Sequence, residues 1–316
     1  MQMLNFNGKS IFFIGDSITA NGTFLKYLRA YFEATGRNIF LHNKGIPGGT
    51  AAISCRALDE ELNGYTPDFA VISLGINDIR YWEYSSSSEA AARLRIRDYY
   101  IENLLSLCRE LRGRGVIPIL CSPFCVNRQM SEAEQVETVV DNKEKSKIAS
   151  SFYNRITFDK LNCELGVLRE RIRALASEMG FAFFDMYADT YNEAEGECYK
   201  SDGIHYSEKG NLLIAKSLLK NMLGEDFVEY EPSDVQGEIF ALEADERAYY
   251  FVKYNIMRDK CTGASDEELA ACVRRWISDN GNASGLTQAR EAGFFRFVTC
   301  HAEKQRYLTK LIRKEV

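Results

Sequence analysis

The apolar positions of roughly the first 225 residues form short continuous runs, separated by longer stretches in which apolar residues recur at helical spacing. A short apolar run without alternation is typical of a strand that is buried on both faces of a parallel sheet. The predicted strands are 10–14, 39–42, 69–74, 116–121 and 181–184. The predicted helices are 22–35, 50–62, 89–112, 150–179 and 207–223. This order predicts an α/β fold with a doubly wound, flavodoxin-like, five-stranded parallel sheet.

One segment of the predicted α/β unit does not fit this alternation. Residues 127–147 are polar and rich in charge, and they follow the fourth predicted strand on its carboxyl side. A solvated insertion explains the composition, whereas a mobile cover over a ligand site explains the position. The pattern alone leaves both interpretations open.

The alternation stops beyond Glu231-Pro232, where only helical patterns follow. Helical spacing covers 238–258, and residues 287–314 predict another helix. Between them, Ser265 and Glu268 have the spacing of a capping box at the start of a helix. We therefore predict an α/β domain over 1–230 and a helical C-terminal extension over 231–316. The extension is expected to act as a scaffold or a homo-oligomer contact, through apolar residues such as Phe294, Phe295 and Phe297.

Composition and charge exclude several broad classes of protein. With 46% hydrophobic residues the chain can bury a core, and its formal net charge of −6 argues against a general nucleic-acid binder. No apolar run approaches the ~18 residues that cross a bilayer, and the start of the chain does not have the pattern of a signal peptide. The nine cysteines contain no CxxC pair, which favours reduced thiols. We expect a cytoplasmic protein without membrane insertion.

One of the three histidines stands in a sequence that suggests chemistry. His205 ends the segment Ser201-Asp202-Gly203-Ile204-His205, which lies between the fifth predicted strand and the next helix. An aspartate three residues ahead, across a turn with glycine, can reach Nδ1 of the ring and leave Nε2 free as a base. A polar loop before a helix is the simpler interpretation of the same residues.

Polar residues also follow the first three predicted strands. Ser17 follows the first strand, as a helix N-cap or as a nucleophile, and no Gly-x-Ser-x-Gly elbow occurs in the chain. Asn77 follows the third strand, as a turn residue or as an amide donor. Gly48 lies in the glycine-rich loop after the second strand, as part of a flexible loop or as a backbone N–H donor. Because ligands bind beyond the carboxyl ends of parallel strands, these residues are expected at one site.

Together these residues supply the groups that acyl transfer requires. The chain resembles the SGNH hydrolases, also called the GDSL esterase/lipase family, through Gly15-Asp16-Ser17, Gly48, Gly75-Ile76-Asn77-Asp78 and Asp202-Gly203-Ile204-His205. The resemblance spans about residues 10–225 and departs from the family motif at Ile18, where the family has leucine. It implies the SGNH-hydrolase fold and a role for Ser17 as nucleophile, for His205 as general base and acid, and for Asp202 as the residue that orients His205. It also implies an oxyanion hole made by the backbone N–H groups of Ser17 and Gly48 and by the Asn77 side chain, without a metal or cofactor.

The substrate is less well defined by the sequence. Tyr81, Trp82 and Phe124 follow predicted strands on the site side, where they can stack on a sugar, line an acyl pocket or pack beneath the 127–147 segment. We expect a small-molecule ester, such as an acetyl or other short-acyl ester of a sugar or related metabolite. The alternatives are a lysophospholipase or thioesterase, an O-acyltransferase, and a non-catalytic binding module on the same fold.

Overall fold

The computed structural model describes residues 4–80, 90–130, 158–258, 260–261, 263–280 and 286–315. Its centre is a parallel five-stranded sheet in the order β2-β1-β3-β4-β5. The strands are β1 (Lys9–Gly15), β2 (Ile39–Gly45), β3 (Phe69–Ser73), β4 (Ile117–Cys121) and β5 (Ala182–Phe184). The predicted doubly wound α/β fold is therefore confirmed.

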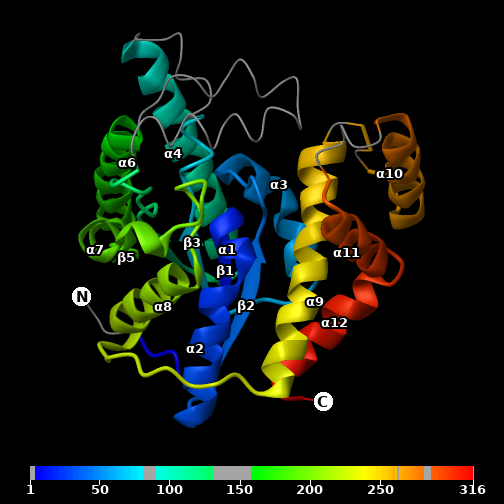
Figure 1. Cartoon of the computed structure of the whole chain (residues 1–316), viewed down its shortest axis with the longest axis horizontal. Helices are drawn as coiled ribbons and strands as arrows, with labels where there is room; N and C mark the ends of the chain where they lie inside the picture. The colour runs from blue at the N-terminus through cyan, green and yellow to red at the C-terminus, as the bar shows by residue number, and fades with distance from the viewer. Residues whose placement is uncertain are drawn as a thin grey trace.

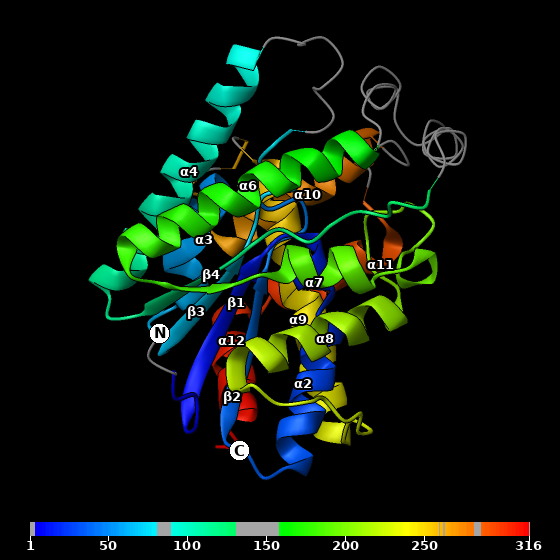
Figure 2. The same cartoon turned by 90° about the vertical axis from the view of Figure 1, so that its left-hand side faces the viewer.

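Helices cover both faces of the sheet, which explains why its strands read as continuous apolar runs (Figure 2). Ile11 and Phe13 of β1 point to one face and Phe12 and Ile14 to the other, because side chains alternate along a strand. The helices on the first face are α2 (Thr23–Ala34), α7 (Met186–Glu193) and α8 (Glu208–Leu223). Those on the second face are α3 (Ala51–Leu62), α4 (Ala90–Gly113) and α6 (Phe158–Met179).

The C-terminal extension is helical, as predicted, and lies along β2 (Figure 1). Its elements are α9 (Asp234–Phe251), a π-helix (Val252–Met257), α10 (Asp266–Asn280), α11 (Gln288–Val298) and α12 (His301–Ile312). The predicted capping box is present, since Ser265 N–H donates to Glu268 Oε2 at 2.8 Å and Glu268 N–H donates to Ser265 Oγ at 3.3 Å. The predicted domain boundary near residue 230 stays a prediction.

The expectation of one helix over 287–314 is wrong, because the chain bends at Thr299-Cys300 between α11 and α12. A straight helix of that length would span about 42 Å, whereas α9, with 18 residues, spans about 27 Å. The bend lets both shorter helices pack on α9. Phe294 and Phe297 of α11 are fully buried beside Tyr249 of α9, so they are not free for the homo-oligomer contact expected from the sequence.

Charged side chains join the extension to the edge strand β2. Leu41 O accepts hydrogen bonds from the Arg29 guanidinium, and Asn43 N–H donates to Glu243 Oε1 of α9 at 2.8 Å. Gly45 O accepts from Arg247 of α9 at 3.1 Å. An edge strand normally leaves such backbone groups unpaired. Here side chains of α9 and α2 satisfy them, so the extension closes this edge of the sheet.

The Arg29–Glu243 ion pair at this contact is almost entirely buried. The two side chains are 4% and 3% exposed, and Arg29 Nη1 donates to Glu243 Oε2 at 2.9 Å. A second buried group joins Lys44 of β2 and Glu61 of α3 to Glu246 and Arg247 of α9. Buried charges are tolerated only when paired in this way, so α9 and the sheet depend on each other.

The nine cysteines are free thiols, of which four are buried and two exposed. Within the described ranges, no helix has both the length and the apolar character that a membrane span requires.

Candidate active site

The register of the sheet brings three strand ends to the same level. Gly15 at the end of β1 is paired with Gly45 at the end of β2 and with Ser73 at the end of β3. The segments that follow these residues therefore meet at the carboxyl edge of the sheet. These are the segments in which Ser17, Gly48 and Asn77 were predicted to form a site.

Ser17 is the first residue of a short helix, α1 (Ser17–Asn21), that begins directly after β1. Asp16 is its N-cap and accepts a hydrogen bond from Ile18 N–H at 2.9 Å, so Ser17 is not the cap and its hydroxyl is free for another role. Gly15 permits this close start, because a Cβ there would lie 2.1 Å from Thr19 Oγ1. As the first helical residue, Ser17 has a backbone N–H outside the helical hydrogen-bond ladder.

Asp202 and His205 are joined within one turn. His205 Nδ1 and Asp202 Oδ2 are 2.6 Å apart, and Asp202 Oδ1 accepts from the backbone N–H groups of Ile204 and His205. Burial acts to raise the pKa of Asp202, but the hydrogen bond and charge of the His205 ring and the two backbone N–H groups lower it below its ordinary value. A carboxylate of this kind fixes the orientation of the imidazole.

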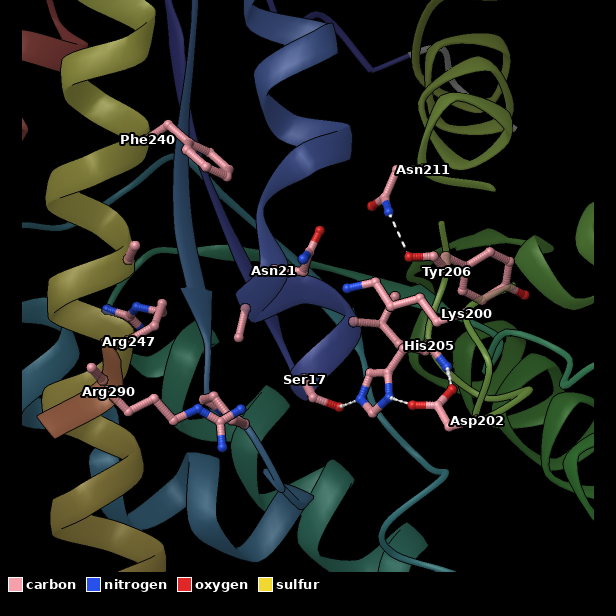
Figure 3. Close-up of a pocket in the computed structure, with 15 residues that line it drawn as sticks. Ser17, Asn21, Lys200, Asp202, His205, Tyr206, Asn211, Phe240, Arg247 and Arg290 are labelled. Atoms are coloured by element: carbon pink, nitrogen blue, oxygen red, sulfur yellow. Dashed lines mark hydrogen bonds and ion pairs between the residues drawn. The ribbon is translucent and has the colours of Figure 1, made fainter. Parts of the chain in front are cut away.

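The His205 ring also reaches the serine. Its Nε2 is 2.8 Å from Ser17 Oγ, which completes a continuous chain of hydrogen bonds from Asp202 through His205 to Ser17 (Figure 3). Ser17 and His205 are 188 positions apart in the sequence. The arrangement can take a proton from the serine hydroxyl while the hydroxyl oxygen attacks a substrate.

His205 does not follow the fifth strand directly, although the sequence suggested that it does. The helix α7 and a 3-10 helix (Gly196–Cys198) stand between β5 and the turn. An antiparallel bridge between Tyr199 and Tyr206 closes the loop that holds Asp202 and His205. The loop is therefore fixed by its own pairing rather than by the strand.

The predicted oxyanion donors lie at the neighbouring strand ends. Ile46 N–H donates to Gly15 O at 2.9 Å, and Asn77 Nδ2 donates to Gly49 O at 3.0 Å, which ties the glycine loop to β1 and to the β3 loop. The Asn77 amide keeps a second hydrogen for another acceptor. Neither Gly48 nor Asn77 is among the residues that line the cavity beside Ser17. Their oxyanion role stays a prediction.

The extension also holds the glycine loop. Asn255, on the π-helix, donates from Nδ2 to Pro47 O at 2.8 Å. Gly48 has φ of +73°, and a Cβ there would lie 3.1 Å from Asn255 Oδ1. Glycine is therefore favoured at position 48 both by the backbone conformation and by the approach of Asn255.

Two buried carboxyl groups organise the same loops. Asp78 Oδ1 accepts from Ala51 N–H at the start of α3 at 2.9 Å, whereas its Oδ2 is buried without a partner among the described residues. Burial raises the pKa of Asp78 to about 7 and that of Asp16 to about 6. The hydrogen bonds of both groups run to helix starts, which is a structural role.

A cavity of about 480 Å³ opens beside Ser17 and His205. Its walls come from the α/β part and, unexpectedly, from the C-terminal extension. The extension contributes Phe240, Ala244, Arg247, Ala248 and Arg290. No sequence motif marks these residues, and the extension was expected to be a scaffold or a homo-oligomer contact, so they were not predicted as part of the site.

Of the three predicted substrate-binding residues, the structure describes only Phe124. Tyr81 and Trp82 lie outside the described residues, as does most of the 127–147 segment. Phe124 is only 5% exposed and does not line the cavity; its ring packs against that of Tyr206, a lining residue, at 5.8 Å between centroids. The apolar core beside β4 takes up its ring, so the structure does not bring Phe124 to the cavity, and its contact with substrate stays a prediction.

The other two histidines have packing roles. His42 is 3% exposed, and burial together with the nearby Lys44 holds its pKa well below the ordinary value. His301 packs against Tyr249 with the two rings tilted, at 4.4 Å between ring centroids. Neither ring lines the cavity beside Ser17.

A known family matches most of the α/β part of the chain, and the fold of one solved structure matches nearly the whole chain. Residues 13–213 match the GDSL-like lipase/acylhydrolase family. The acetylxylan esterase of Geobacillus stearothermophilus is 24% identical over 238 residues, which are 68% of this chain and 94% of the esterase. A solved structure of a gut microbial diltiazem-metabolizing enzyme has a TM-score of 0.72 at 13% identity and covers 99% of this chain and 96% of its own. A catalytic mutant of the Geobacillus esterase covers 72% of this chain and 100% of its own, with a TM-score of 0.49 and 22% identity.

Proposed function

Because the chain belongs to the GDSL-like lipase/acylhydrolase family, we propose that it is a serine esterase that hydrolyses a small ester through an acyl-enzyme on Ser17. The observation that carries this proposal is the hydrogen-bond chain Asp202–His205–Ser17, with its distances of 2.6 Å and 2.8 Å. A serine hydroxyl is a weak nucleophile until a neighbouring base accepts its proton, and this geometry supplies the base and the group that orients it.

In the first half of the proposed reaction, Ser17 Oγ bonds to the ester carbonyl carbon while its proton passes to His205 Nε2. The carbonyl oxygen becomes an oxyanion, for which the backbone N–H groups of Ser17 and Gly48 and the amide of Asn77 are the proposed donors. His205 then gives its proton to the alcohol oxygen as the bond from that oxygen to the carbonyl carbon breaks. The alcohol leaves, and the acyl group stays on Ser17.

In the second half, water takes the place of the alcohol. His205 accepts a proton from the water as its oxygen attacks the acyl carbon, and the same donors bind the new oxyanion. The bond to Ser17 Oγ then breaks, and Ser17 recovers a proton from His205. Asp202 stays ionised throughout and stabilises the imidazolium that forms twice in each cycle.

We propose an acetyl or other short-acyl ester of a sugar or related metabolite as the substrate. The cavity of about 480 Å³ is within the usual range for a small ligand. The similarity to an acetylxylan esterase supports a short acyl group. Polar and charged side chains share the wall with apolar ones, which suits a hydroxylated alcohol better than a long lipid chain.

The test is hydrolysis of p-nitrophenyl esters from acetate to decanoate by the wild-type protein. We expect kcat/KM to be highest for acetate or butyrate and to fall for longer chains, because the cavity is small. A preference for decanoate would contradict the short-acyl assignment and favour a lysophospholipase. No turnover of any ester by folded protein would contradict the esterase proposal and favour a transferase or a non-catalytic module.

The oxyanion assignment predicts the effect of Asn77→Ala. Loss of one donor is expected to lower kcat by about 10²–10³-fold, or about 3 kcal/mol, with little change in KM, because the donor acts on charge that develops in the transition state. Asn103→Ala is the matched control, since the Asn103 side chain donates to Tyr99 O within α4 and does not line the cavity. Full turnover by Asn77→Ala would show that another group stabilises the oxyanion.

A further inference from the structure

We propose that the cavity beside Ser17 binds an anionic group of the substrate, a carboxylate or phosphate, through Arg290 and Lys200. This inference rests on the proposed esterase function and narrows its substrate class to esters that also carry a negative charge. It follows from which charges in the cavity are already paired and which are not.

Arg290 enters the cavity from the extension. It lies in the first turn of α11, and Figure 3 shows its side chain extending toward Ser17. Its guanidinium carbon lies 4.4 Å from the centroid of the Phe251 ring, which supports the plane of the group. No carboxylate in the described part of the chain lies within ion-pair distance of it. Burial lowers the pKa of Arg290, as expected for a cation without a counter-charge.

Lys200 enters from the α/β part. Lys200 is exposed, and its backbone N–H donates to His205 O at 2.7 Å. This hydrogen bond holds Lys200 beside the turn that contains Asp202 and His205. In Figure 3 its ammonium group points toward Asn21, on the other side of Ser17 from Arg290. Like Arg290, it has no carboxylate partner among the residues described.

The other charged side chains of the cavity already have partners. Arg247 also lines it but pairs with Glu61 at 2.7 Å and with Glu246 at 2.6 Å. Asp202, the one carboxylate among the lining residues, is bound to His205. With Asp202 ionised and His205 neutral, Arg290 and Lys200 leave an excess of one positive charge around Ser17, in a chain whose formal net charge is −6.

This arrangement favours a substrate that carries a carboxylate or phosphate group. The planar guanidinium matches the two oxygens of a carboxylate or phosphate, and partial burial strengthens the attraction compared with an exposed site. Two cations from opposite walls can hold the anion while the ester carbonyl lies at Ser17 Oγ. The apolar side chains of Phe240, Ala244 and Ala248 lie on the same wall as Arg247 and leave room for the uncharged part of the alcohol.

The test compares three aryl acetates that release acetate in the same way: 4-acetoxybenzoate, 4-acetoxyphenyl phosphate and the neutral 4-acetoxybenzamide. For each variant, kcat/KM for an anionic ester is divided by kcat/KM for the neutral one, so that intrinsic reactivity cancels between variants. Arg290→Gln is expected to lower this ratio roughly 10- to 100-fold, because kcat/KM for the anionic ester falls more than kcat/KM for the neutral one. Arg290→Lys should keep part of the preference, and Lys200→Met should lower it by a smaller factor. The two anionic esters distinguish a carboxylate site from a phosphate site.

The control is Arg296→Gln, on the same helix, because Arg296 pairs with Asp245 on the exposed surface and is not a lining residue. The inference is overturned if the ratio is the same in wild type, Arg290→Gln and Arg296→Gln, and the esterase proposal then still stands on the neutral ester. If the wild type hydrolyses none of the three, the esterase proposal fails. Calorimetric binding of 4-acetoxybenzoate to Ser17→Ala then decides the inference: binding that Arg290→Gln removes supports it, and equal or absent binding overturns it.

Discussion

Ser17→Ala is expected to lower kcat for ester hydrolysis by on the order of 10⁴-fold or more. The variant has no oxygen to form the acyl-enzyme, and His205 loses the hydroxyl that lies 2.8 Å from its Nε2. His205→Ala should cause a similar loss, because the hydroxyl is then no longer activated. The double variant should be no worse than either single one, since the two residues act as a unit.

The measurement is steady-state hydrolysis of p-nitrophenyl acetate, together with the thermal unfolding midpoint of each variant. Ser177→Ala is the matched control, because Ser177 is exposed on α6 and does not line the cavity. Its kcat should equal that of the wild type. If Ser17→Ala kept more than a tenth of wild-type turnover, another residue would have to be the nucleophile.

Glu243→Ala is expected to lower the free energy of unfolding by about 3–5 kcal/mol, the cost of leaving one member of a buried ion pair without its partner. The change leaves the Arg29 guanidinium buried without a counter-charge and removes the acceptor of Asn43 N–H. The contact between α9 and the edge strand β2 loses both at once. Because α9 also supplies the cavity wall, ester hydrolysis should fall with stability.

Urea unfolding of wild type and variant gives the difference directly, provided that the slope of the transition is unchanged. Asp59→Ala is the control, because Asp59 also pairs with an arginine, Arg114, but its side chain is 82% exposed. An exposed pair contributes little, so this variant should lose only a small fraction of what Glu243→Ala loses. Equal losses in the two variants would contradict the structural role assigned to the buried pair.

Local pattern determined much of the fold. Strands 10–14 and 69–74 were predicted within a residue or two of β1 and β3, because a sheet covered on both faces requires continuous apolar runs. The capping box at Ser265 and Glu268 was predicted because its two hydrogen bonds are local. The break at Thr299-Cys300 was not, because it depends on the length of α9, the partner of α11 and α12.

In the candidate site, too, some residues could be predicted from local pattern and others could not. Asp202 and His205 were predictable as a pair because they lie within one turn, and Ser17 because the ends of parallel strands share an edge. Phe124 could not be placed from the sequence, because an aromatic residue after a strand can point into the core as easily as into a cavity. Arg290 carries no local signal at all.

The sequence by itself therefore determined the α/β fold and the residues of the hydrogen-bond chain, since both are encoded in short-range patterns and in the chemistry of a few residue types. Only the tertiary structure decided that the C-terminal helices close the β2 edge and form a wall of the cavity beside Ser17. The physical reason is that the role of a charged side chain depends on its partners: Glu243 stabilises the fold through its buried ion pair with Arg29, whereas Arg290 can bind an anion because no carboxylate of the described residues pairs with it. Those partners are set by packing between segments about 200 or more residues apart.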